Sequence, residues 1–180
     1  CPAVTIDNHL VAVCDRDVSR ATAEQLCAGF GGALARVDDQ SENDALVAAL
    51  LNVLPSAANQ AWLGGDDRVE EGVFRWPDGA IIPTPFSNWG LDQPNNEGGL
   101  QHCMSLTVVP ISGVQPGEWA DRACDTESKP FICDPPATGG PSSPGCVEQV
   151  VFGRRRFLCA NAATYSAAIG VCAADGGQLV

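Results

Sequence analysis

The sequence predicts an α+β fold that is rich in disulfide bonds, with two helices, small antiparallel sheets and a long loop region. Three observations lead to this prediction. The 180 residues include nine cysteines, which favours disulfide bonds in a chain of this size. Two helix-like patterns lie in the first third of the chain. From Trp62 onward, short apolar stretches are broken by glycine, proline, asparagine and aspartate, a pattern typical of strands joined by loops.

One cysteine spacing occurs twice. The first three and the last three cysteines are thirteen residues apart, and the two sets are offset by 145 residues: Cys1, Cys14, Cys27 and Cys146, Cys159, Cys172. The sequence CAGFGGALA at 27–35 is answered by CAADGGQLV at 172–180. We therefore expect one complete domain over residues 1–134 and the N-terminal part of a second over residues 146–180. Residues 135–145 (PPATGGPSSPG) predict a linker rich in proline, glycine and serine.

A β-hairpin is predicted at the start of each copy. Residues 4–13 (VTIDNHLVAV) are typical of two short strands with a turn at residues 7–8. The counterpart at residues 150–158 (VVFGRRRFL) has Gly153 at the turn position. A bridge between the first two cysteines of each copy would join the two ends of its hairpin.

A short helix is predicted over residues 22–30 (TAEQLCAGF). Either Ser19 or Thr22 can cap its N-terminus, because a hydroxyl oxygen can accept a hydrogen bond from a free N–H of the first turn. The glycine pair at 31–32 is expected to end the helix, since glycine readily adopts the left-handed conformation found there.

A second helix is predicted to begin at Ser41. Ser41 followed three residues later by Asp44 resembles a capping box. The apolar residues of 45–54 (ALVAALLNVL) continue the helix, which is expected to end before Pro55.

Composition and charge exclude several kinds of partner. The net charge of −12 argues against nucleic acid and against anionic membrane surfaces. No apolar run approaches the roughly 18 residues needed to cross a bilayer, so membrane insertion is not expected. The cysteines indicate an oxidising, extracellular compartment, while the competing zinc interpretation lacks any CxxC pair. Cys1 could also carry a lipid anchor, but it aligns with the internal Cys146, which favours a disulfide bond.

Nothing in the sequence indicates catalysis. The two histidines, His9 and His102, lie in the predicted hairpin and beside a loop cysteine, with no metal-ligand spacing between them. His9 is interpreted as a surface residue of the hairpin. No nucleophile-elbow motif, phosphate-binding loop or paired-cysteine redox site occurs. A non-enzymatic binding module is therefore expected.

Five motifs in a fixed order indicate a family: WLGG (62–65), VFRWPDG (73–79), NWGLDQPNN (88–96), QHC (101–103) and GEWADRACDTESKPFIC (117–133). In this order and spacing, residues 1–134 resemble a C-type lectin-like domain, in the long form with an N-terminal hairpin disulfide. Residues 146–180 resemble the first third of another such domain, truncated at Val180, as in a bacterial-type tandem array. The resemblance implies the C-type lectin-like fold.

The resemblance also implies which cysteines pair: Cys1–Cys14, Cys27–Cys133, Cys103–Cys124 and, in the second copy, Cys146–Cys159. Cys172 corresponds to Cys27, so its partner would lie beyond Val180. Most aromatic residues of the motifs are interpreted as core residues: Trp62, Phe74, Trp76, Trp89, Trp119 and Phe131.

A calcium site is implied in the long loop, where sugar-binding members of the family hold the ion. The motif here is Gln93-Pro94-Asn95, which mixes the two usual versions, and Pro94 follows a cis bond in the family. Gln101 stands at a glutamate position, and an Asn-Asp pair of the family is replaced by alanine and Asp121. Fewer carboxylates weaken calcium binding. We therefore expect either no metal, with these residues in a hydrogen-bonded loop, or weakly bound calcium.

A second calcium site of some family members matches Asp67, Glu71 and Asn96. The other two positions of that site hold Gln101 and His102, which lack a negative charge. The alternative interpretation is that Asp67 and Glu71 are solvated turn residues.

These features predict a secreted recognition or adhesion module that binds a glycan or a protein through the loop from Ser87 to Ala123. The alternative is a structural subunit of an extracellular fibre or surface layer built from tandem lectin-like domains. Neighbouring copies are possible partners, because an incomplete second domain would need cover for its apolar residues: Val150, Phe152, Phe157, Leu158, Ile169 and Val171.

Overall fold

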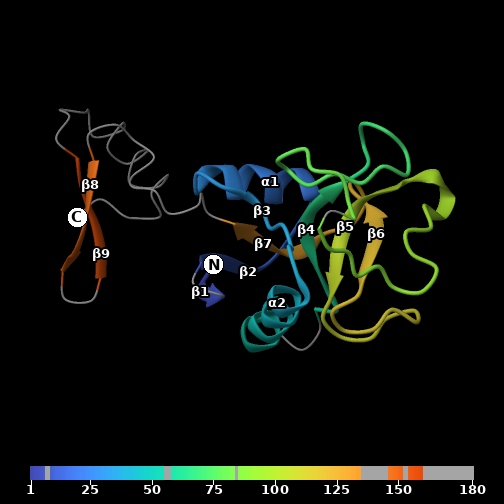
Figure 1. Ribbon diagram of the computed structural model, residues 1–180, viewed down its shortest axis with the longest axis horizontal. Helices are drawn as coiled ribbons and strands as arrows, with labels where there is room; N and C mark the ends of the chain where they lie inside the picture. The colour runs from blue at the N-terminus through green and yellow to red at the C-terminus, as the bar shows by residue number, and fades with distance from the viewer. Residues whose placement is uncertain (7–8, 55–57, 84, 135–145, 152–153, 160–180) are drawn as a thin grey trace.

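The computed structural model describes residues 1–6, 9–54, 58–83, 85–134, 146–151 and 154–159, with His9 and the last two segments described by their backbone alone. Its helices are α1 (Arg20–Gly29), α2 (Gln40–Val53) and the short 3₁₀ helix η1 (Glu97–Gly99). Its strands are β1 (Ala3–Ile6), β2 (His9–Val18), β3 (Ala33–Leu34), β4 (Gln60–Asp66), β5 (Gln101–Thr107), β6 (Trp119–Ala123), β7 (Lys129–Asp134), β8 (Cys146–Val151) and β9 (Arg154–Cys159). The predicted α+β class is confirmed (Figure 1).

One sheet forms the frame of residues 1–134. Its strands follow the order β1-β2-β7-β4-β5-β6, and β3 pairs with β7 outside this path. Neighbouring strands are antiparallel except β4 and β7, which are parallel where Trp62 lies opposite Phe131. Because β2 pairs with β7, the two ends of the domain lie side by side in the same ladder.

The alternation of side chains along the strands divides the core between the two faces of this sheet. On β7, Ile132 belongs to one buried cluster, which also contains Leu46 of α2. Its neighbours Phe131 and Cys133 belong to the other cluster, together with Cys27 of α1. Figure 1 accordingly shows α1 and α2 on opposite sides of the strands.

Helix α1 begins at Arg20, directly after the first of the two predicted caps, and ends before the predicted glycine pair. Ser19 is the N-cap, and its hydroxyl oxygen accepts a hydrogen bond of 3.3 Å from the backbone N–H of Thr22. After the last turn, Gly31 adopts a φ of 80°, and its N–H donates to the carbonyl oxygen of Ala28 at 2.9 Å. This left-handed glycine ends the helix without the steric cost that a side chain would add.

The predicted start of α2 is wrong, because its N-cap is Asp39 and not Ser41. The Asp39 Oδ1 atom accepts a hydrogen bond of 2.9 Å from the N–H of Glu42. The Glu42 carboxylate in turn accepts one of 2.7 Å from the N–H of Asp38. A carboxylate caps a helix at least as well as a hydroxyl group, so the helix begins earlier. It ends at Val53, before Pro55 as predicted.

Three disulfide bonds confirm the implied pairing: Cys1–Cys14, Cys27–Cys133 and Cys103–Cys124. Each of them contributes at least one cysteine to the cluster on the α1 face of the sheet. The predicted aromatic core is confirmed as well. Five of its six residues are buried: Trp62, Phe74, Trp76, Trp119 and Phe131. The sixth, Trp89, is partly buried and packs against the core.

Strands β8 and β9 form the second predicted hairpin. In it, Val151 lies opposite Arg154 and Cys146 opposite Cys159. The predictions for the turn residues, for residues 135–145 and for residues 160–180 lie outside the described part of the chain. Neither described α-helix is long and apolar enough to cross a membrane.

We predict that a chain ending at Asp134 folds and remains monomeric. Strand β7 ends at this residue, and the three disulfide bonds close among residues 1–133, so the sheet is complete there. The near-UV circular dichroism of the shortened chain should match that of the full chain, and light scattering should give the mass of a monomer. Failure of the shortened chain to fold would mean that residues 135–180 belong to the same cooperative unit.

Candidate functional site

A long irregular segment leaves the sheet between β4 and β5 (Figure 1). It passes through turns and the helix η1, and it rejoins the sheet at Gln101. The peptide bond between Gln93 and Pro94 is cis, as the resemblance implied. Since β6 pairs with β5, the segment returns beside β6, which carries Asp121. The predicted calcium residues therefore meet where the segment, β5 and β6 come together.

The side chain of Asp121 fixes the middle of this segment. Asp121 is fully buried, with 0% of its surface exposed. Its Oδ1 atom accepts a hydrogen bond of 3.0 Å from the N–H of Asn95, and its Oδ2 atom accepts one of 2.6 Å from the N–H of Asn96. Hydrogen bonds to an ionised acceptor are stronger than neutral ones. One carboxylate thus holds two successive residues of the loop.

Side-chain carbonyl groups of the segment also bond to its own backbone. The Asn95 Oδ1 and Gln101 Oε1 atoms both accept hydrogen bonds from the N–H of Glu97, at 3.2 and 3.0 Å. The Asn96 Oδ1 atom accepts one of 3.0 Å from the N–H of Gln101. The buried Oε1 atom of Gln93 lacks a hydrogen-bond partner among the described residues. Of the four predicted residues, the structure brings Asn95, Gln101 and Asp121 into one network and leaves the Gln93 carbonyl outside it.

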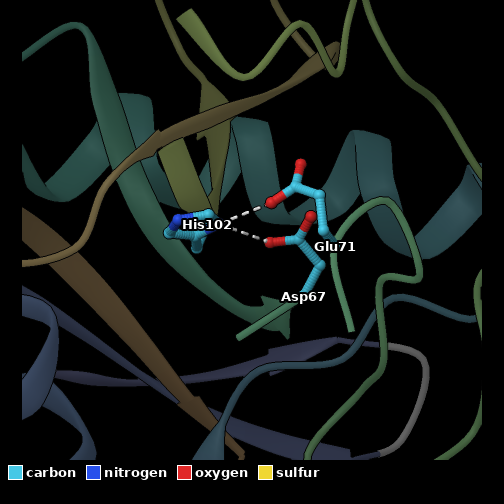
Figure 2. Close-up of side chains that lie close together, drawn as sticks. All are labelled: Asp67, Glu71 and His102. Carbon is cyan, nitrogen blue, oxygen red and sulfur yellow. Dashed lines mark hydrogen bonds and ion pairs between the residues drawn. The ribbon is translucent and has the colours of Figure 1, made fainter. Parts of the chain in front are cut away.

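A second polar cluster lies beside the first and contains Asp67, Glu71 and His102 (Figure 2). The Nδ1 atom of His102 lies 3.1 Å from Asp67 Oδ1 and 3.2 Å from Glu71 Oε2. Asn96 Nδ2 donates to the other oxygen of Glu71. The three residues predicted for a second calcium site, Asp67, Glu71 and Asn96, are therefore close together. That they bind calcium stays a prediction.

The alternative interpretation of Asp67 as a solvated turn residue is wrong. Asp67 is 3% exposed, and its Oδ2 atom accepts a hydrogen bond of 2.8 Å from the N–H of Gly72. The side chain turns inward because the backbone N–H of Asp67 donates to the carbonyl oxygen of His102 at 3.1 Å, which places it beside β5. Glu71, by contrast, is exposed, with 57% of its side-chain surface accessible.

Sequence reasoning placed His102 at a position of this second site but did not count it as a ligand, because it lacks a negative charge. His102 lies more than thirty positions from both carboxylates, so its approach to them depends on the pairing of β4 with β5. In that pairing Asp66 lies opposite Cys103, after a register shift that follows Trp62. The available signal was that the motif WLGG lies at the end of one strand and the motif QHC at the start of another.

Arginines behind this cluster hold the end of β4 in place. Arg20 is 1% exposed, and its guanidinium donates to the carbonyl oxygens of Leu63 and Gly64. Arg68 donates to the carboxylates of Asp66 and Glu24, and the hydrogen bond to Asp66 is the largest cause of the raised pKa of Arg68. The acidic residues around β4 are thus divided, since Asp66 pairs with arginine and Asp67 with histidine.

Residues 17–135 match the family model of the lectin C-type domain. The chain is 34% identical over 113 residues to pulmonary surfactant-associated protein D of Bos taurus, covering 62% of this chain and 27% of that protein. It therefore spans little more than a quarter of that relative's length. The carbohydrate-recognition domain of cow CD23, solved in the presence of a GlcNAc2Man3 oligosaccharide, has a TM-score of 0.62 at 24% identity, covering 77% of this chain and 98% of that one.

A calcium-independent type II antifreeze protein has a similar structure, with a TM-score of 0.59 at 23% identity. The similarity covers 74% of this chain and 92% of that protein. At this level of identity the solved structures show a shared fold, which confirms the C-type lectin fold expected from the motifs.

We predict that Asp121→Ala frees the loop at Asn95 and Asn96. Two backbone N–H groups lose their charged acceptor, so the free energy of unfolding should fall by about 2 kcal/mol. Hydrogen exchange should become faster at these two amides, as measured by NMR. Asp125→Ala is the matched control, because Asp125 is an exposed aspartate in the β6–β7 turn. Unchanged exchange in Asp121→Ala would contradict the role given to this carboxylate.

Proposed function

This chain belongs to the C-type lectin domain family, and we propose that it is a secreted, non-enzymatic recognition module whose long loop binds its ligand without calcium. The ligand is a glycan or a protein. The similarity to carbohydrate-recognition domains supports the glycan as the first candidate. The three disulfide bonds support an extracellular location, since such bonds persist in oxidising compartments.

The hydrogen bonds of Asp121 are the observation that carries the calcium-independent part of this proposal. Calcium in proteins takes six to eight oxygen ligands, several of them from carboxylates. Both oxygens of Asp121 already accept backbone N–H groups, and the carbonyl groups of Asn95 and Gln101 do the same. Asp121 is also the only carboxylate among the four predicted residues, and calcium affinity falls as carboxylates are removed, so this donor set fits calcium poorly. The network itself supplies the loop with the support that an ion would give.

The outer surface of the loop offers a ligand both polar and apolar contacts. Asn95 is exposed on it, next to the exposed Pro94. Leu91 and Leu100 in the same segment are 82% and 68% exposed. Binding sites for small molecules combine apolar area with a few placed polar groups, and a sugar ring presents both kinds of surface. This composition supports the loop as the binding face.

A tandem arrangement is also part of the proposal, with residues 146–180 as the start of a second domain. Its support is the register of the two hairpins. Ile6 lies opposite His9 in the first, and Val151 lies opposite Arg154 in the second. The residue numbers of the second pair exceed those of the first by 145, which is the same offset that relates the cysteines. Tandem domains also favour the second candidate function, a structural subunit of an extracellular fibre or surface layer.

We predict that the chain binds immobilised oligosaccharides on a glycan array equally well in calcium and in EDTA. The loop is held by Asp121 and not by an ion, so signals in the two buffers should agree within about twofold. Asn95→Ala should weaken binding about tenfold, since it removes an exposed amide of the loop. Asn52→Ala on α2 is the matched control, because Asn52 is exposed there.

Two outcomes of this experiment would contradict parts of the proposal. Binding that is lost in EDTA, together with micromolar calcium affinity by calorimetry, would restore the calcium-dependent mechanism. Absence of any glycan signal in both buffers would rule out the glycan ligand and leave the protein ligand.

We predict that non-reducing peptide mapping recovers a Cys146–Cys159 bond. The two residues lie opposite each other in the β8–β9 pairing, which brings their Cα atoms within the range that a disulfide can span. Recovery of Cys146 or Cys159 joined to any other cysteine would contradict the tandem arrangement.

A further inference from the structure

We propose that Asp67, Glu71 and His102 bind a divalent transition metal ion of the Zn²⁺ type. One potential ligand atom from each residue lies within 4.8 Å of the other two. Figure 2 shows the two carboxylates approaching the same ring from the loop side. The assignment lies at the position of the calcium site expected at Asp67, Glu71 and Asn96 and differs from it in the class of ion, because His102, which lacks the charge that calcium prefers, serves here as a ligand.

The spacing of the ligand atoms suits a small ion. Zinc binds histidine nitrogen and carboxylate oxygen at about 2.0–2.2 Å in a tetrahedron. Two atoms at the corners of such a tetrahedron lie about 3.3–3.5 Å apart. The Nδ1 atom of His102 lies 3.1 and 3.2 Å from its two carboxylate neighbours. All three ligand atoms lie within 4.8 Å of one another, so movement of these side chains alone would place an ion between them.

The charge balance of the cluster is a second observation in favour of a cation. The side chain of Asp67 is 1% exposed, and among the described residues it forms no ion pair with a lysine or an arginine. A buried carboxylate is costly unless it is paired or bound to a metal. Glu71 brings a second negative charge to the same nitrogen of His102. One imidazole, even when protonated, leaves the cluster with an excess of negative charge.

The supporting contacts orient the ligands. The N–H of Gly72 binds Asp67 Oδ2, which leaves Oδ1 directed at His102. Asn96 donates to Glu71 Oε1, which leaves Oε2 directed at the same nitrogen. Hydrogen bonds of this kind fix ligand geometry around bound metals and raise affinity.

The histidine determines the class of ion. Calcium is a hard cation that takes oxygen ligands almost exclusively, whereas imidazole suits zinc, copper and nickel. Zinc takes both histidine nitrogen and carboxylate oxygen as ligands, and a site with three protein ligands leaves the fourth position for water. Glu71 is exposed on one side, so both the ion and that water can reach the cluster from solvent.

Calorimetry with ZnCl2 and with CaCl2 tests the proposal on the full chain carrying Cys172→Ser. This substitution removes a competing zinc ligand, because Cys172 is the one cysteine outside the four predicted disulfide bonds of this chain. We expect one Zn²⁺ ion per chain, bound at least about tenfold more tightly than Ca²⁺. His102→Ala and Glu71→Gln should each weaken zinc binding by at least about 30-fold. Near-UV circular dichroism confirms that each variant is folded.

His9→Ala is the matched control, since the chain has two histidines, and it should change zinc affinity less than about twofold. His102→Asp supplies a third carboxylate and should shift the preference from Zn²⁺ toward Ca²⁺. Zinc affinity that survives His102→Ala, or calcium bound more tightly than zinc by the starting chain, would overturn the proposal. Absence of saturable zinc binding would overturn it as well, and would leave a histidine–carboxylate ion pair. Glycan binding is measured in a separate experiment, so neither result for zinc decides whether the proposed function is correct.

Discussion

The antiparallel pairing of β2 with β7 is the constraint on which the rest of the structure depends. It brings both ends of the domain into one ladder, and the Cys27–Cys133 bond fastens α1 to β7 across 106 residues of sequence. Bringing distant residues together costs entropy, and a disulfide bond lowers that cost by restricting the unfolded chain. The segment between β4 and β5 can stay irregular because the strands at its two ends are already fixed by this closure.

Asp121 extends the constraint from the sheet into the loop. Its backbone lies opposite Met104 in the β5–β6 ladder, so the position of its carboxylate follows from strand register. The exposed leucines of the loop bury little apolar area, and such segments open easily when nothing else holds them. Two hydrogen bonds to a buried charge supply what apolar packing does not. The conformation of the loop at Asn95 is therefore set by β6.

The sequence predicted the features that depend on local pattern, such as the two hairpins and a cap at either Ser19 or Thr22, and the family resemblance carried by its motifs implied the first-domain disulfide bonds. It failed where several residues compete for one role, since Asp39 and Ser41 are both good caps and only the path of the chain decides between them. It failed again in the interpretation of Asp67 as a solvated residue, because the burial of Asp67 against His102 depends on a register shift between β4 and β5. The burial of a single carboxylate cannot be deduced from the sequence of a polar turn, because nothing in the local sequence distinguishes Asp67 from the exposed residues that follow it.

Asn96 connects the two polar clusters and couples them mechanically. Its N–H donates to Asp121, its Nδ2 atom donates to Glu71, and its Oδ1 atom accepts from Gln101. Asparagine is one of few residues that readily adopt the left-handed conformation found here, with a φ of 42°. A cation held by Glu71 would act on the loop through this one side chain. Because Asp121 also holds the backbone N–H groups of Asn95 and Asn96, the effect at Asn95 would stay small, in keeping with ligand binding that is unchanged in EDTA.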